Sequence, residues 1–288
     1  RLLRQFFGWK AAWGGTWIAY TFPPFLLYTN RSLFSNAAVL AFGLWSVWLI
    51  HRIKSYELRV RSEELFLLGF LCAVTAAIRP VELIWIIPWW LWAAWGWRPT
   101  KQEWSLMGLG ASLVFIPMML LAYQSYGTAF RFGYLMKDNI LSISTKVPMT
   151  NNQLPMTILP FGFHIDFLIK NIVAYFIGLL WPWMMVLGLA LWMFWKECKH
   201  AARSWITGPL ALAAWTLFVL FVLYGGGLYL DHIGFWAPTI GNSFLRYTLP
   251  MALMIGWAGA FLWTRVPRIT GLWALSVPMV IAFLLMGF

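Results

Sequence analysis

Ala76-Ala77-Ile78-Arg79-Pro80-Val81-Glu82-Leu83-Ile84 separates two apolar runs, residues 65–79 and 81–97, and determines how the chain can be threaded through a bilayer. As one helix, the two runs would be roughly 50 Å long at about 1.5 Å per residue, whereas the hydrocarbon core of a bilayer is about 30 Å thick. Pro80 also interrupts helical hydrogen bonding at this point. The segment therefore predicts a hairpin of two short helices, with Arg79 and Glu82 at its turn.

The composition of the whole chain indicates an integral membrane protein. Hydrophobic residues make up 61% of the 288 residues and charged residues 10%, against about 25% charged residues in a typical soluble domain. A soluble fold of this size cannot bury so much apolar surface, so part of it must face lipid. The 22 Trp residues fit the same environment, because Trp favours the interface between membrane and water.

Nine apolar runs predict transmembrane helices, for which about 17–25 residues are usual. They lie at about 11–28, 35–51, 65–79, 81–97, 104–123, 169–195, 205–224, 248–264 and 269–288. No internal repeat, low-complexity tract or soluble domain is evident. We therefore expect an all-α polytopic membrane protein in which residues 1–288 form a single helical domain, part of a larger helical bundle.

The basic residues indicate an orientation rather than a nucleic-acid surface, although the net charge is +12. They cluster in short segments between apolar runs. With Arg1 in the cytoplasm and the hairpin in place, two thirds of the Lys and Arg residues lie inside, as the positive-inside rule requires. The long loops at about 124–168 and 225–247 then lie outside. We expect a multi-pass protein of the cell (inner or plasma) membrane whose functional face lies outside the cytoplasm.

The ends of the chain and its cysteines add two expectations. The sequence begins at Arg1 without Met and ends at Phe288 inside an apolar run, which indicates a fragment of a longer protein. Cys72 lies in an apolar run and Cys198 in a basic linker, a pattern that predicts neither a disulfide framework nor a metal site.

Arg246-Tyr247 is the strongest candidate for a binding site. An Arg at the mouth of a helix can hold phosphate through its planar fork of donors, and a Tyr beside it adds a hydroxyl. The alternative is a pair of interfacial anchors that only sets the depth of the helix. Other polar groups on the expected outer face are Asn30, Asn36, Arg131 and Tyr134.

Two further pairs of charged or titratable residues leave alternatives open. Arg79 and Glu82 either bind an anionic head group or substrate, or neutralise each other at a tight turn. Asp231-His232 follows three glycines and suggests acid–base chemistry or a divalent metal, or is a solvated loop. Asp166 is expected to favour the dipole at a helix N-terminus. The sequence shows no nucleophile elbow, P-loop, dinucleotide-binding glycine pattern or metalloprotease helix.

Several stretches resemble the C-type membrane glycosyltransferases, the relatives of dolichyl-phosphate-mannose–protein mannosyltransferase and of the lipid A aminoarabinose transferase. They are Pro23-Pro24-Phe-Leu-Leu-Tyr28-Thr-Asn30-Arg-Ser-Leu-Phe-Ser35-Asn36, then Gly69-Phe-Leu-Cys-Ala-Val-Thr-Ala-Ala-Ile-Arg79-Pro80, then Tyr126-Gly127-Thr-Ala-Phe-Arg131-Phe-Gly133-Tyr134, and Thr239-Ile-Gly241-Asn-Ser-Phe-Leu-Arg246-Tyr247-Thr-Leu-Pro250. The likeness covers most of the chain, in the family's order.

The resemblance implies transfer of a sugar from a polyprenyl-phosphate carrier to a protein, lipid or glycan acceptor at the outer face, with no role for nucleic acid. It often implies a divalent metal, Mg²⁺ or Mn²⁺. Arg246, with Arg131 or Arg79, would hold the carrier phosphate, and Tyr247 and Tyr134 would help place it. The family's catalytic Asp belongs to an outer loop that would lie upstream of Arg1, so no catalytic residue maps onto this sequence.

Other functions remain open at this point. A transporter or flippase would need ionisable residues near the bilayer midplane and paired halves with broken helices, whereas the charges here lie mainly in loops. A surface-polysaccharide polymerase or ligase would share the lipid-linked donor. A purely structural role is a further alternative.

Overall fold

The computed structural model describes residues 2–30, 35–55, 61–129, 164–198, 204–226 and 243–265. Every regular element in these ranges is a helix, as the sequence predicted. The expected helix at 269–288 and the candidate residues Arg131, Tyr134, Asp231 and His232 lie outside them. The chain divides into a first unit, residues 1–37 and 163–288, and a second unit, residues 38–162.

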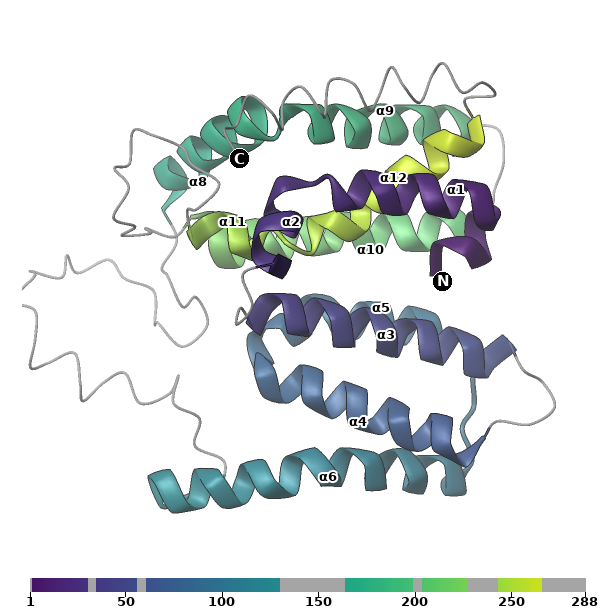
Figure 1. Ribbon diagram of the computed structural model, residues 1–288, viewed down its shortest axis with the longest axis vertical. Helices are drawn as coiled ribbons and strands as arrows, with labels where there is room; N and C mark the ends of the chain where they lie inside the picture. The colour runs from purple at the N-terminus through teal and green to yellow at the C-terminus, as the bar shows by residue number, and fades with distance from the viewer. Residues whose placement is uncertain are drawn as a thin grey trace, which may run out of the picture. The chain divides into compact units, whose positions relative to one another are not determined.

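The second unit begins in α3 (Ser35–Ser55) and continues through α4 (Ser62–Ile78), the 3₁₀ turn η1 (Pro80–Glu82), α5 (Leu83–Ala94) and α6 (Lys101–Tyr126). The predicted break at Arg79-Pro80 is confirmed, because the chain bends by 114° between Ser62–Ile78 and Pro80–Ala94. Pro80 opens η1, where its missing N–H costs no hydrogen bond. Figure 1 shows α4 and α6 side by side.

Glycine brings α4 and α6 into backbone contact. A Cβ atom at Gly69 of α4 would overlap the carbonyl oxygen of Met107, and one at Gly110 of α6 would overlap that of Phe66. Small residues are the usual means by which membrane helices approach closely, since burial away from water does not drive their association within lipid. The α4–α6 contact therefore has the character of a membrane helix pair.

The first unit contains α1 (Leu2–Tyr20), α2 (Pro23–Asn30), α8 (Ile165–Asn171), the π-helical segment η3 (Ile172–Leu179), α9 (Trp181–Cys198), α10 (Ser204–Leu220), the π-helical segment η4 (Phe221–Gly225), α11 (Ser243–Tyr247) and α12 (Met251–Arg265). The buried helix α12 packs against both α1 and α9. Gly15 of α1 meets the backbone of Gly256, so this pair also approaches through small residues.

Two expected helices of the first unit are interrupted, and a third begins later than expected. The run at 11–28 divides into α1 and α2 before Pro23, and the run at 169–195 bends by 93° between Ile165–Leu179 and Trp181–Lys196. The helix expected at 248–264 is present as α12, which starts at Met251, after the short helix α11. Single uninterrupted helices are therefore wrong for the runs at 11–28 and 169–195, and each of these two breaks lies beside a proline.

Some of these helices are long and apolar enough to cross a membrane. Within the described ranges, Ser35–Ser55 and Lys101–Ser125 qualify alone, and up to four spans result if each bent pair counts as one. On α6, Leu109, Leu113, Leu120 and Leu121 are each about 60% exposed, as expected for side chains that face lipid. The finer count of nine crossings stays a prediction.

Candidate functional site

Several helix ends meet in the first unit. The short helix α11 contacts α2 and η4, and η4 contacts α8; Figure 1 shows α2, α8 and α11 at one end of this unit. Side-chain amides join the ends: Asn36 Nδ2 donates to the carbonyl oxygen of Arg246 at 2.9 Å, and Asn171 Nδ2 donates to that of Gly225 at 2.7 Å. Both Asn residues are buried, so these bonds hold the backbone on either side of the site.

Arg246 lies at the centre of this junction. It is half-buried on α11, and its Nη2 donates to the hydroxyl of Tyr247 at 2.8 Å. Its Cζ lies 4.8 Å from the centre of the Tyr247 ring, a cation–π distance. Within the described ranges, the ion pairs are Arg52–Glu64 and Arg79–Glu82, so no carboxylate there neutralises Arg246.

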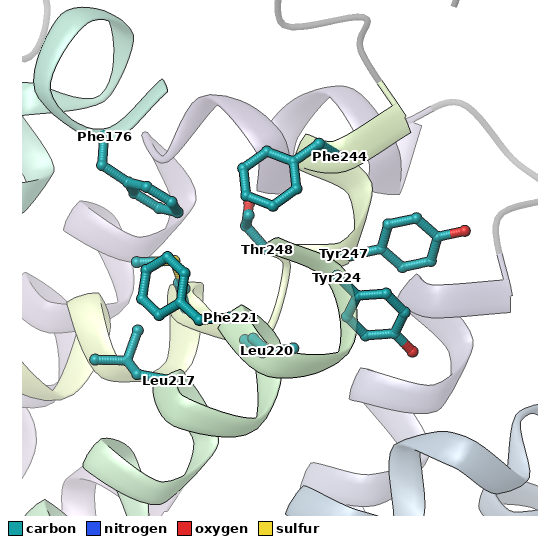
Figure 2. A pocket seen from close by; sticks show the side chains of 9 residues that line it. Phe176, Leu217, Leu220, Phe221, Tyr224, Phe244, Tyr247 and Thr248 are labelled. Atoms are coloured by element: carbon teal, nitrogen blue, oxygen red, sulfur yellow. The ribbon is translucent and has the colours of Figure 1, made fainter. Parts of the chain in front are cut away.

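A stacked pair of tyrosines supports the guanidinium from behind. The rings of Tyr224, in η4, and Tyr247, in α11, lie 4.2 Å apart at an interplanar angle of 8°, and both residues are buried. Figure 2 shows their hydroxyl oxygens pointing away from the phenylalanine side chains. The two tyrosine rings therefore border an apolar interior, and their hydroxyls point away from it.

The interior behind the tyrosines is an apolar pocket (Figure 2). It is lined by Phe176, Leu217, Leu220, Phe221, Tyr224, Phe244, Tyr247, Thr248 and Met251. Its volume is about 10 Å³, roughly the space that the centre of one water molecule needs. It is too small to hold a sugar, and Tyr247 is the lining residue that contacts Arg246 among the contacts described above.

A local turn fixes where Arg246 lies in the chain. Thr248 donates through its hydroxyl to the carbonyl oxygen of Leu245 at 2.7 Å, and its backbone N–H donates to the same oxygen at 3.0 Å. Leu245 and Leu249 are fully buried on either side. Since Pro250 cannot continue the hydrogen-bond pattern of α11, the chain turns and starts α12 at Met251. Arg246 thus lies on a short helix that is held at both ends.

Arg79 and Glu82 belong to the second unit and pair with each other. Arg79 Nη1 lies 3.4 Å from Glu82 Oε1, and the two side chains are 11% and 5% exposed. The indole N–H of Trp85 donates to the other carboxylate oxygen of Glu82. This geometry supports the alternative in which the two charges neutralise each other at the turn, because each is already paired.

The other candidates lie at helix ends. Asn30 ends α2, and Asp166 lies in the first turn of α8, where a negative charge favours the helix dipole. His164 precedes that helix and makes no side-chain capping bond. No three His, Cys, Asp or Glu residues in the described ranges are grouped to hold a metal. Those residues therefore do not fit the divalent metal that the family resemblance implies.

Two residues of the junction were missing from the predicted site. Tyr224 precedes a run of three glycines, and Asn171 follows Lys170 near the start of the apolar run 169–195. A lone Asn in such a run is expected to bond a backbone carbonyl, because an unsatisfied amide is costly in lipid; that signal could have identified Asn171. Comparison of the chain with protein-family models, curated proteins and solved structures gave no significant match.

Proposed function

We propose that this chain is part of an integral membrane glycosyltransferase that moves a sugar from a polyprenyl-phosphate carrier to an acceptor at the outer face of the membrane. One observation carries the proposal: Arg246 has no carboxylate partner within the described ranges and lies where helix ends converge. Arg246 would bind the carrier phosphate. The order of the family-like stretches along the chain supports the same reading.

The arrangement around Arg246 suits a phosphate monoester or diester. A guanidinium has five N–H donors, and the bond to Tyr247 uses one nitrogen, which leaves donors for phosphate oxygens. The buried aromatic residues behind it exclude water, and in such surroundings a charge-assisted hydrogen bond is stronger than in bulk solvent. Asn36 holds the Arg246 backbone through the carbonyl, so the charge is positioned before the ligand arrives.

In the reaction, an acceptor oxygen would form a bond to the anomeric carbon while the bond from that carbon to the phosphate oxygen breaks. The polyprenyl phosphate leaves with the bonding electrons, and Arg246 would stabilise its added negative charge. The acceptor hydroxyl loses its proton to a general base. We assign that base to no residue of this chain, and no metal to the described residues.

Binding of a polyprenyl monophosphate in detergent tests this role directly. We expect Arg246→Ala to weaken the affinity of the protein for polyprenyl monophosphate about 10- to 100-fold, since a hydrogen bond to a charged group contributes about 1.5–3 kcal/mol. Arg246→Lys keeps the charge but loses the planar fork, so the affinity of this variant should lie between those of wild type and Arg246→Ala. Lys170→Gln is the matched control, because Lys170 is exposed on α8 of the same unit. Equal affinity of Arg246→Ala and wild type, or equal loss in Lys170→Gln, would refute the assignment.

A transporter or flippase of a lipid-linked substrate is the second candidate. The observation that favours it is the pair of sharp bends, 114° in the second unit and 93° in the first, because transporters build their sites from broken helices. Reconstituted vesicles distinguish the two functions. Movement of a labelled polyprenyl phosphate between leaflets without sugar transfer would favour transport.

A further inference from the structure

One end of the second unit gathers basic residues from four helices. Lys54 lies in the last turn of α3, Arg61 immediately precedes α4, and Arg98 and Lys101 lie between α5 and the first turn of α6. Lys54 Nζ donates to the carbonyl oxygen of Trp95, which joins α3 to the end of α5. We call Lys54, Arg61, Arg98 and Lys101 the basic end of this unit.

A contact between Arg52 and Glu64 brings α4 to the same place. Arg52 Nη2 lies 2.7 Å from Glu64 Oε1, so the last turn of α3 meets the first turn of α4. Figure 1 shows the end of α3 and the starts of α4 and α6 on the same side of this unit. The four cations of the basic end therefore share one surface region.

Two of the three acidic residues near the basic end in the described ranges already have partners. Glu64 pairs with Arg52, and Glu103 accepts from the backbone N–H of Thr100 in a capping box. Glu63 is the remaining acid in the first turn of α4. All four cations of the basic end are exposed, and within the described ranges none forms an ion pair or stacks on a ring. Among the described residues, this end therefore carries an excess of positive charge.

Two exposed tryptophans flank these cations. Trp95 is 79% exposed and Trp104 is 62% exposed, one on each side of the α5–α6 connection. Trp favours the head-group level of a bilayer, where its ring is in contact with the acyl region and its N–H with water. The basic end is therefore expected to lie at head-group depth, on the face that the charge distribution assigns to the cytoplasm.

The basic residues at the ends of the first unit's helices differ in this respect. Lys196 lies 3.8 Å from the centre of the Trp192 ring, Arg4 lies 5.1 Å from that of Trp9, and Arg265 lies 5.5 Å from that of Phe261. Each of these cations already has an aromatic partner, so each gains less from a new anion than a cation of the basic end does.

From these observations we propose that the basic end binds the phosphate groups of anionic phospholipids. Lys and Arg near a membrane surface attract anionic lipids, and basic groups between membrane helices bind their head groups. Because the cations are spread over the ends of four helices, they can contact several lipid head groups at once, whereas one small ion would contact only some of them. The proposal does not rest on sugar transfer, because it uses residues of the second unit only, whereas Arg246 belongs to the first.

The test is a titration of the purified chain in detergent with fluorescent phosphatidylglycerol or phosphatidylcholine, followed by anisotropy. We expect tighter binding of phosphatidylglycerol, weakening as salt is raised, because exposed charges are screened. A variant with four substitutions, Lys54→Gln, Arg61→Gln, Arg98→Gln and Lys101→Gln, should bind phosphatidylglycerol at least tenfold more weakly than wild type. Each cation near the surface contributes roughly fivefold in affinity, and the total is smaller than the product because the effects of neighbouring residues do not add. The far-UV circular dichroism of this variant should match that of wild type.

The matched control removes the same charge from the first unit: Arg4→Gln, Lys10→Gln, Lys196→Gln, Arg265→Gln. It should keep most of the affinity for phosphatidylglycerol. Equal loss in both variants would mean that only net charge matters and would overturn the proposal. Equal affinity of wild type for the two lipids, or binding unaffected by salt, would overturn it without any variant.

Discussion

Replacing Gly110 by Ala should loosen the contact between α4 and α6. A Cβ at this position would overlap the carbonyl oxygen of Phe66 and lie 2.9 Å from the backbone nitrogen of Phe70. Both obstacles are backbone atoms of a helix, so neither can rotate away as a side-chain tip does. The helices must move apart, which reduces contacts along the whole pair.

Gly108 provides an internal reference for the magnitude. It lies in α6 two residues before Gly110, and a Cβ there meets nothing within 4 Å. Both substitutions gain the same intrinsic helix preference of Ala over Gly, about 1 kcal/mol, so that term cancels in the comparison. The remaining difference is the cost of overpacking, about 1–3 kcal/mol. We expect Gly110→Ala to be less stable than Gly108→Ala by about that amount.

Unfolding in mixed micelles with increasing dodecyl sulfate, followed by far-UV circular dichroism, measures the two free energies. Gly69→Ala should behave like Gly110→Ala, because its Cβ would overlap the Met107 carbonyl oxygen. The double variant should lose less than the sum, since helices already displaced by one methyl accommodate the other. If Gly108→Ala and Gly110→Ala unfold alike, the close α4–α6 contact does not exist in the protein.

Three further substitutions test the junction and the turn by the same unfolding measurement. Asn36→Ala leaves the carbonyl oxygen of Arg246 without its amide donor and should lower the unfolding free energy by about 0.5–1.5 kcal/mol; an unchanged value would contradict that bond. Glu82→Ala removes the carboxylate that pairs with the largely buried cation of Arg79 and should lower the unfolding free energy by about 3–5 kcal/mol. The double variant Arg79→Met, Glu82→Leu should recover most of that loss. Tyr224→Leu removes the ring stacked on Tyr247, and this stacking should contribute about 0.5–1.5 kcal/mol beyond the free energy lost with the buried apolar area, whereas Tyr224→Phe keeps the ring and should keep the stacking contribution.

The helical class of the fold was predictable because composition alone imposes it. With 61% hydrophobic residues, backbone groups in lipid must be satisfied inside each segment, which a helix achieves locally. The pairing of helices was not predictable in the same way. Gly69 and Gly110 are two of 23 glycines, and their importance follows only from the backbone that each one meets.

The candidate site was predictable in part. Arg246 and Tyr247 were chosen because a cation next to a hydroxyl at the mouth of a helix can hold phosphate, and the structure joins them by a hydrogen bond. Asn36 was chosen only for its place at an outer turn, yet its amide bonds the carbonyl of Arg246, 210 residues further along the chain. Such a bond depends on tertiary packing, and one sequence contains no local signal for it.

The prolines explain why the breaks in the helices were harder to place than the helices themselves. Pro80 and Pro23 begin η1 and α2, Pro182 follows the first residue of α9, and Pro250 precedes α12. Pro117 instead lies inside the unbroken helix α6. A proline at the first turn of a helix loses no bond, whereas one in the interior leaves the carbonyl four residues earlier without its donor.

Neighbouring structure therefore decides which outcome occurs. In lipid, an interior proline is tolerated where adjacent groups satisfy the released carbonyl, and a break is stable only where the two new helix ends find partners. At the break before Pro182 the backbone N–H of Leu180 donates to the carbonyl oxygen of Tyr175, at 2.7 Å, and Leu180 is fully buried. The sequence marks each proline as a possible bend, and the partners available to the freed backbone groups select the bends that form.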